Sequence, residues 1–185
     1  MILDIVMYGD PVLRAKCARV DEITAETKEL ADNMMETMRD AQGVGLAAPQ
    51  IGVPIQLAIV DVSHDPECIT FLKIDGEEST LEEAMPFVFV NPQIDYGDDK
   101  ETCSEGCLSF PDLQGDIRRP EAIKVRFTLL DGREVEVETD GLLARAIQHE
   151  TDHLNGVLFI DRMSTASKSA LRGRLKRLQK QFNKR

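Results

Sequence analysis

The sequence predicts an α+β fold, with mainly antiparallel β-sheets packed around a central helix and a further helix at the carboxyl end. Residues 123–138 alternate between apolar and polar types on both sides of Asp131-Gly132, which is typical of a β-hairpin. The period then becomes helical in GLLARAIQHETDHL, from a start at Asp140 to an end at Asn155-Gly156, a pair that suits a left-handed cap. Strands that are followed by a helix packed on them favour an α+β arrangement.

The first element is expected to be a helix. It starts at a cap on Thr24 or Thr27 and runs to about Asp40, because apolar residues recur there at helical spacing. Residues 43–54, GVGLAAPQIGVP, hold too many glycines and prolines for a regular helix. We expect them to form a loop or an irregular strand.

Two apolar runs, residues 55–62 and 87–90, are expected to form strands. The stretch between them, residues 64–85, is rich in acidic residues and only partly strand-like. We expect this stretch to be a surface insertion.

Length and composition indicate a globular domain. The chain has 185 residues, of which 42% are hydrophobic and 30% charged, unlike a disordered chain. No apolar run reaches the roughly 18 residues that a membrane helix needs, and the amino terminus lacks the features of a secretion signal. Four cysteines do not make a disulfide framework in a chain of this length and favour a reducing compartment. The absence of a transit segment favours a bacterial cytoplasm, and we expect a monomer that does not bind membranes.

Charge is divided unequally along the chain. Residues 162–185 carry nine Lys or Arg and no acidic residue, whereas residues 1–161 carry 13 basic and 33 acidic residues. We expect residues 1–161 to form the main domain and the basic segment to extend it, packed on the acidic body or bound to a polyanion. The apolar residues of the basic segment recur at helical spacing and predict an amphipathic helix: Leu171, Leu175, Leu178 and Phe182.

The most specific motif is HETDH at residues 149–153. His149 and His153 are four residues apart and share one helix face, so both imidazoles can bind one metal ion. Glu150 lies about 100° further round the helix and can act on a water molecule at that ion as general base. The alternative is two core histidines with an incidental glutamate. Each buried imidazole would then need its own polar partner, and a metal supplies one to both.

A catalytic ion needs a third protein ligand and an open coordination position. No Glu follows Glu150 in the chain, and Phe159 occupies the position where an HExxHxxGxxH motif has its third His. The third ligand is therefore expected upstream, with a cysteine thiolate as the leading candidate. Cys107 follows a glycine that lets the backbone approach closely. Cys103 and Cys107 could instead form half of a closed, four-ligand structural site with the two histidines.

Three motifs in a fixed order make the chain resemble the peptide deformylase family. They are GVGLAAPQ at residues 43–50, EGCLS at 105–109 and QHETDH at 148–153. The resemblance runs from about Tyr8 to Asp161 and departs from the family pattern at Thr151, where an apolar residue is usual. It implies removal of the formyl group from the amino-terminal formylmethionine of nascent polypeptides, with release of formate.

The resemblance also implies roles for single residues. A metal-bound water or hydroxide attacks the formyl carbon, with Glu150 as general base and acid. The Gln50 side-chain amide and the Leu108 backbone N–H stabilise the resulting oxyanion. The metal is expected to be Fe(II), and Zn(II) or Ni(II) fits the same ligands. These ligands are Cys107, His149 and His153.

The family pattern further implies an apolar pocket for the methionine side chain. Glu105 and Arg119 are expected either to form an ion pair that holds the cysteine loop or to be unpaired surface charges. Cys103 is expected near the pocket wall and Arg145 at or near its rim. The remaining substrate-binding residues expected from the pattern are Val44, Gly45, Glu105, Gly106, Leu142 and Ala146.

Two other functions stay open on the sequence alone. A metallo-endopeptidase is disfavoured by the upstream cysteine ligand and by the absence of a secretion signal. A non-enzymatic, metal-stabilised module that binds the ribosome predicts a four-ligand metal and does not account for Glu150 and Gln50. The expected partners are N-formylmethionyl nascent peptides and, through the basic helix, ribosomal RNA near the exit of the peptide tunnel, as in some deformylases.

Overall fold

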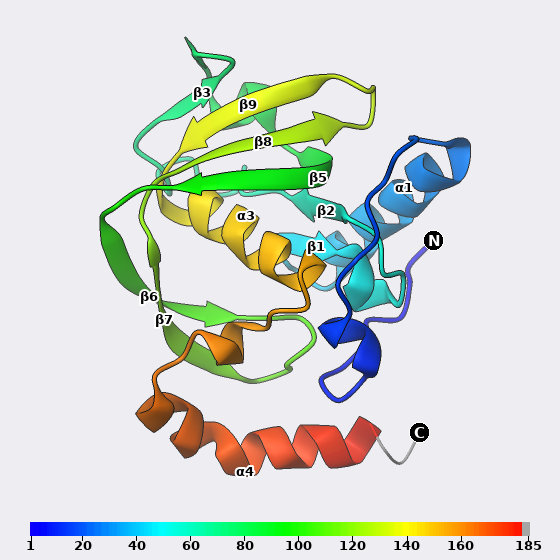
Figure 1. The fold of residues 1–185 in the computed structure, drawn as a ribbon, viewed down its shortest axis with the longest axis vertical. Coiled ribbons are helices and arrows are strands. Elements are labelled where there is room, and N and C mark those ends of the chain that lie inside the picture. The colour runs from blue at the N-terminus through cyan, green and yellow to red at the C-terminus, as the bar shows by residue number, and fades with distance from the viewer. Residues whose placement is uncertain (183–185) are drawn as a thin grey trace.

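The fold has two sheets arranged around one helix (Figure 1). The computed structural model describes residues 1–182, with Phe182 described by its backbone only. The larger sheet has the strand order β1-β2-β5-β8-β9-β3-β4, and β6 pairs with β7 in the smaller sheet. All of these pairings are antiparallel, which confirms the predicted fold class. The strands are β1 (Gly45–Ala47), β2 (Leu57–Val60), β3 (Leu72–Ile74), β4 (Glu77–Glu78), β5 (Phe87–Tyr96), β6 (Lys100–Gly106), β7 (Gln114–Pro120), β8 (Ile123–Leu129) and β9 (Glu134–Thr139).

Helix α3 (Gly141–Leu154) is buried between the two sheets and carries the HETDH motif. Its amino terminus is fixed by the segment that precedes β3. The Asp140 carboxylate accepts a hydrogen bond from the backbone N–H of Thr70 at 2.7 Å, and the Leu142 N–H donates to the Cys68 carbonyl at 2.9 Å. Gly141 has φ +56°, and a Cβ there would lie 2.1 Å from the Cys68 oxygen. Only glycine therefore allows this helix to start so close to the neighbouring backbone.

Helix α1 (Ala25–Asp40) confirms the first predicted element. Thr24 is the cap, and its hydroxyl accepts a hydrogen bond from the backbone N–H of Thr27. Met34 and Met38 are fully buried against β1 and β2, because they share the apolar face of the helix.

The stretch predicted to be a surface insertion is instead partly built into the fold. Strand β3 pairs with β9, and the short β4 pairs with β3 at the edge of the larger sheet. Leu72 in β3 and Leu81 in the single-turn helix α2 (Leu81–Ala84) are buried in the main core. The acidic residues around them obscured these few core positions in the sequence.

The β6–β7 hairpin was not predicted. Most of its side chains are polar and only a few positions are buried, so the apolar alternation that identifies strands is weak. Strand β5 also extends beyond the predicted residues 87–90, through a register irregularity at Val90–Gln93. Asn91, at this irregularity, has φ +56°.

Helix α4 (Thr165–Phe182) lies beside the β6–β7 hairpin, at the opposite end of the molecule from the larger sheet (Figure 1). Leu171, Leu175 and Leu178 pack against a core cluster that includes Phe110 and Leu113. The amphipathic prediction for these three leucines is confirmed, and the Phe182 side chain lies outside the described side chains. Three 3-10 turns, Pro11–Arg14, Ala48–Ile51 and Phe159–Asp161, complete the elements. Over residues 1–182, no helix has the length and apolar character needed to cross a membrane.

Candidate metal and catalytic site

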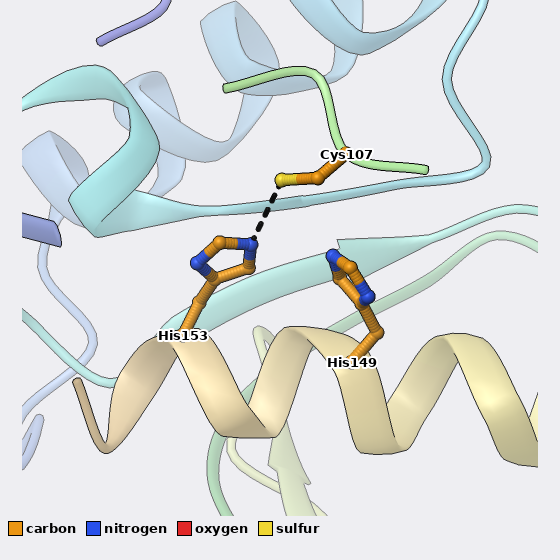
Figure 2. Close-up of side chains that lie close together, drawn as sticks. All are labelled: Cys107, His149 and His153. Carbon is orange, nitrogen blue, oxygen red and sulfur yellow. Dashed lines mark hydrogen bonds between the residues drawn. The ribbon is translucent and has the colours of Figure 1, made fainter. Parts of the chain in front are cut away.

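The structure brings together one thiol and two imidazoles (Figure 2). His149 and His153 project from adjacent turns of α3 toward Cys107, which follows β6. A metal-binding atom of each residue lies within 4.8 Å of those of the other two, and the Cys107 Sγ is 3.3 Å from the His153 Nε2. Burial lowers the pKa of His153, which favours the neutral imidazole that binds a metal.

These three side chains fit a single divalent ion. Ligands at the usual distances of about 2.0–2.3 Å from a tetrahedral ion lie roughly 3.5 Å apart, close to the separation between Cys107 and His153. Cys103 is not part of the cluster, which holds three protein ligands within the part of the chain that the structure describes. Three ligands leave one position open, as in catalytic sites, whereas a structural site is closed by four.

Glu105 holds the outer nitrogen of one of these imidazoles. Its buried carboxylate lies 3.1 Å from the His149 Nδ1, which leaves Nε2 free to face the ligand cluster. Arg119 donates two hydrogen bonds to the same carboxylate, at 2.7 and 3.0 Å, and Arg145 donates a third at 2.8 Å. Burial alone would raise the pKa of Glu105, but the hydrogen bonds from His149 and Arg119 lower it to about 2. Glu105 is therefore a permanent anion behind the imidazole, and its expected pair with Arg119 is formed.

Two further residues, which the sequence did not single out, extend this buried network. Arg119 also donates to the Asp152 carboxylate at 2.7 Å. Arg162, which precedes α4, donates to both oxygens of Asp152, at 2.5 and 2.6 Å. Asp152 lies within the HETDH motif, but its partners Arg119 and Arg162 come from outside the helix, so they could not be found from helical spacing.

Glu150 is buried and lines the same cavity as Cys107 and His149. Its carboxylate lies over Gly45 in β1, where a Cβ would be 2.3 Å from Oε1. Burial raises the pKa of Glu150 to about 7, although the positive charges of His149 and Arg119 lower it in part. One carboxylate oxygen, Oε2, has no hydrogen-bond partner within residues 1–182. A carboxyl group with this pKa can accept and return a proton near neutral pH.

Gln50 is held as a hydrogen-bond donor beside the cluster. Its side-chain oxygen accepts from the Ala47 N–H at 2.9 Å, which orients the amide nitrogen toward Cys107 and Ser109. That nitrogen lies 3.5 Å from the Cys107 Sγ and 3.2 Å from the Ser109 Oγ. The Leu108 N–H belongs to the same loop, and within the described structure no hydrogen bond engages it. Ser109 was not among the expected residues, although it lies in the EGCLS motif.

A cavity of about 980 Å³ opens onto these residues. Arg145, expected at the rim, is largely buried and donates to Glu105 and to the Ile117 carbonyl, so it belongs to the wall. Cys103 does not line the cavity, whereas Ser104, Glu105 and Gly106 of the same strand do. The other expected residues all line it: Val44, Gly45, Gln50, Glu105, Gly106, Cys107, Leu108, Leu142, Ala146, His149 and Glu150, with His153 deeper at the cluster.

Comparison with known proteins identifies the family. The family model described as polypeptide deformylase matches residues 2–169. The chain is 46% identical to a peptide deformylase of Opitutus terrae over 182 residues, covering 97% of this chain and 94% of that one. It is also 46% identical to a peptide deformylase of Agrobacterium fabrum over 164 residues, covering 88% of each chain.

Solved structures agree with these relatives. The crystal structure of peptide deformylase from Thermus thermophilus aligns with a TM-score of 0.82 at 37% identity. The alignment covers 98% of this chain and 99% of that one. The fold, the ordered motifs and the sequence identity over nearly the full length lead to one conclusion: the chain belongs to the peptide deformylase family.

Proposed function

We propose that this protein hydrolyses the N-formyl group from the amino-terminal formylmethionine of nascent polypeptides and releases formate. The observation that carries the proposal is the buried Glu150 carboxylate, which has a pKa of about 7 and stands beside a three-ligand cluster at a cavity of about 980 Å³. Family membership supports the same reaction. Relatives from bacteria support a bacterial cytoplasmic location.

Cys107, His149 and His153 would hold one divalent metal. A thiolate with two imidazoles suits Fe(II), Zn(II) and Ni(II), and we propose Fe(II) as the resident ion. When bound, this ion supplies Lewis acidity to water and to the formyl oxygen. Glu105 keeps the His149 ring in the orientation that presents Nε2, as partners behind metal-bound imidazoles generally do.

Glu150 moves the protons of the reaction. Its carboxylate takes a proton from the attacking water and later gives it to the departing amine of the methionine. A pKa near 7 suits both steps, because the group is neither too weak a base nor too weak an acid near neutral pH. Gly45 leaves room for this carboxylate to approach the reacting atoms.

Gln50 and Leu108 stabilise negative charge on the formyl oxygen. The Gln50 amide is preoriented through Ala47, so its N–H groups need little reorganisation during the reaction. The Leu108 backbone N–H is the second donor. Neither group titrates, so both remain donors over the whole working pH range.

The methionine side chain occupies the apolar part of the cavity. Val44, Leu142 and Ala146 line it, and Val44 and Leu142 pack on the main core, which makes this wall rigid. A flexible thioether side chain suits such a wall.

The test is formate release from a formyl-Met-Ala-Ser peptide by protein loaded anaerobically with Fe(II). The control is Glu150→Gln, which keeps the side-chain volume and removes the proton-transfer group. Release by wild type and a loss of about 10²–10⁴-fold in the variant, at equal metal content, support the proposal. Absence of release from metal-loaded wild type would overturn it. Endopeptidase and ribosome-binding assays would then test the two alternatives.

We also propose that the exposed basic face of α4 binds ribosomal RNA. Its cationic side chains point away from the leucines that anchor the helix, on an otherwise acidic protein. Arg172, Lys176, Arg177 and Lys180 are exposed, and changing all four to Gln leaves the anchoring leucines intact. The variant should bind ribosomes more weakly and with a shallower salt dependence than wild type. Unchanged ribosome binding would contradict the role of the helix and leave the proposed hydrolysis unaffected.

A further inference from the structure

Helix α4 contributes one side chain to the cavity, that of Arg174. Arg174 is exposed, and its Nη1 donates one hydrogen bond, at 3.5 Å, to the backbone carbonyl of Asp112. Within residues 1–182 the Arg174 side chain makes this hydrogen bond only, and it forms no ion pair with a carboxylate. The other arginine of the lining, Arg145, is already engaged by Glu105. Arg174 is therefore a cation at the cavity whose charge is not neutralised by the described residues.

The position of Arg174 is fixed by the hydrophobic core. Its neighbour Leu175 is 8% exposed and packs in the same cluster as Phe110 and Leu113. Phe110 and Leu113 themselves line the cavity. The leucines of α4 and the turn beside the cavity are thus one packed unit, and this unit determines where Arg174 lies.

The charges around Arg174 define what it can bind. Arg145 is paired with Glu105, which Arg119 also binds, and His149 and Glu150 belong to the reacting centre. Asp112 is the remaining charged residue of the lining, and its carboxylate reduces the effect of Arg174 without pairing with it. A guanidinium has five N–H donors in a planar fork that matches a carboxylate. Most of these donors remain open to a bound peptide.

We propose that Arg174 is a specificity-determining residue, which favours substrates with an acidic side chain shortly after the formylmethionine and disfavours a basic one. The inference rests on the proposed function, because it concerns the peptide held in the same cavity. Helix α4 thereby contributes to substrate choice in addition to carrying the basic surface.

The experiment compares kcat/KM for two series of amidated peptides, formyl-Met-Xaa-Ala and formyl-Met-Ala-Xaa, with Asp, Asn or Lys at Xaa. Amidation removes the terminal carboxylate, so the side chain is the varied charge. A further peptide, formyl-Met-Ala-Asn with a free carboxyl end, shows whether a terminal carboxylate has the same effect. The enzymes are wild type, Arg174→Gln and Arg174→Glu. Arg172→Glu is the matched control, because it makes the same charge change about 200° around the helix and outside the cavity lining.

Wild type should prefer Asp to Lys in at least one series. Each charge pair at an exposed site is worth roughly a two- to fivefold effect, and the Asp-to-Lys ratio combines several such pairs, so it should fall by at least about tenfold in Arg174→Glu. Arg174→Gln should be intermediate, Arg172→Glu should keep the wild-type ratio, and added salt should reduce the preference. A ratio in Arg174→Glu within about twofold of wild type in both series would overturn the inference. The neutral Asn peptides separate the two proposals, because no formate from them would overturn the proposed function itself.

Discussion

The Glu150 carboxylate lies directly over the Cα of Gly45. A Cβ at residue 45 would meet Oε1 at 2.3 Å, Cδ at 2.8 Å and Cγ at 2.9 Å. The contact joins β1 to α3, since Gly45 begins the strand and Glu150 lies near the end of the helix. The absence of a side chain at residue 45 thus determines where the proton-transfer group stands.

Gly45→Ala should therefore displace this carboxylate. A shift of about 1 Å in a reacting group can cost about 10²-fold in rate, and we expect a fall of this order in kcat with little loss of bound metal. Steady-state kinetics and metal analysis would test this together. Gly173→Ala is the control, because a Cβ there meets nothing within 4 Å. Full activity of Gly45→Ala would show that Glu150 need not occupy its present position.

Glu105→Gln should destabilise the fold. The substitution leaves Arg119 and Arg145 buried with one carboxylate fewer, and removing one partner of a buried ion pair costs about 3–5 kcal/mol. Urea unfolding would measure the loss. Glu101→Gln, at an exposed position of the same strand, should change stability by less than about 0.5 kcal/mol. Equal stability of the two variants would contradict a structural role for the Glu105 network.

Thr151→Val should stabilise the protein. The Thr151 hydroxyl is buried and has no hydrogen-bond partner within residues 1–182, so a methyl group of similar shape removes an unsatisfied polar atom. We expect a gain of about 1 kcal/mol in the free energy of unfolding, with activity retained. The matched change Thr139→Val removes a hydroxyl that donates to the Phe71 carbonyl at 3.0 Å and should destabilise by about 1 kcal/mol. Losses of the same size in both variants would be inconsistent with an unpaired Thr151 hydroxyl.

The ion pair of Arg14 with Asp161 predicts a pH-dependent contribution to stability. Partial burial would raise the pKa of Asp161, but hydrogen bonds from Arg14 and from the Leu158 N–H lower it below its usual value. A carboxyl whose folded pKa is lowered stabilises the fold above its unfolded pKa of about 3.9. That contribution is lost as pH falls through the lower, folded pKa.

Wild type should accordingly exceed Asp161→Asn in free energy of unfolding by up to about 1 kcal/mol at neutral pH. The difference should shrink below about pH 4. Denaturant unfolding of both proteins across this range measures the difference and cancels the effects of other carboxyl groups. A difference that grows on acidification would have the wrong sign for this pair.

Metal binding should stabilise wild type through Cys107. A ligand at a hundred times its Kd adds about 2.7 kcal/mol to the free energy of unfolding, so Zn(II) should raise the thermal midpoint of metal-free wild type. Cys107→Ala should lose most of this increase. Cys103→Ala should retain it, because Cys103 lies outside the ligand cluster. Loss of the increase in both variants would instead favour the closed, four-ligand site.

Some elements could be predicted because their signals are local. The hairpin around Asp131-Gly132 follows from apolar residues at every second position. The helix that carries His149 and His153 follows from residues spaced four apart. The backbone imposes both patterns within a few residues. The family itself followed from three short motifs in order. The β6–β7 hairpin escaped because polar side chains carry no such period. The strand-like part of residues 64–85 does form β3, but its place in the core was missed because its buried residue stands among acidic ones.

The fold class, the central helix with its paired imidazoles and the family could all be inferred from residue patterns alone. The folded chain was needed to show which distant groups meet: Glu105 with His149 and Arg119, Arg119 with Asp152, Glu150 with Gly45, and Arg174 with the cavity. The difference lies in the distance along the chain over which each signal acts. Periodicity fixes which face of an element is apolar, whereas contacts between residues tens of positions apart depend on how two sheets and two helices pack together.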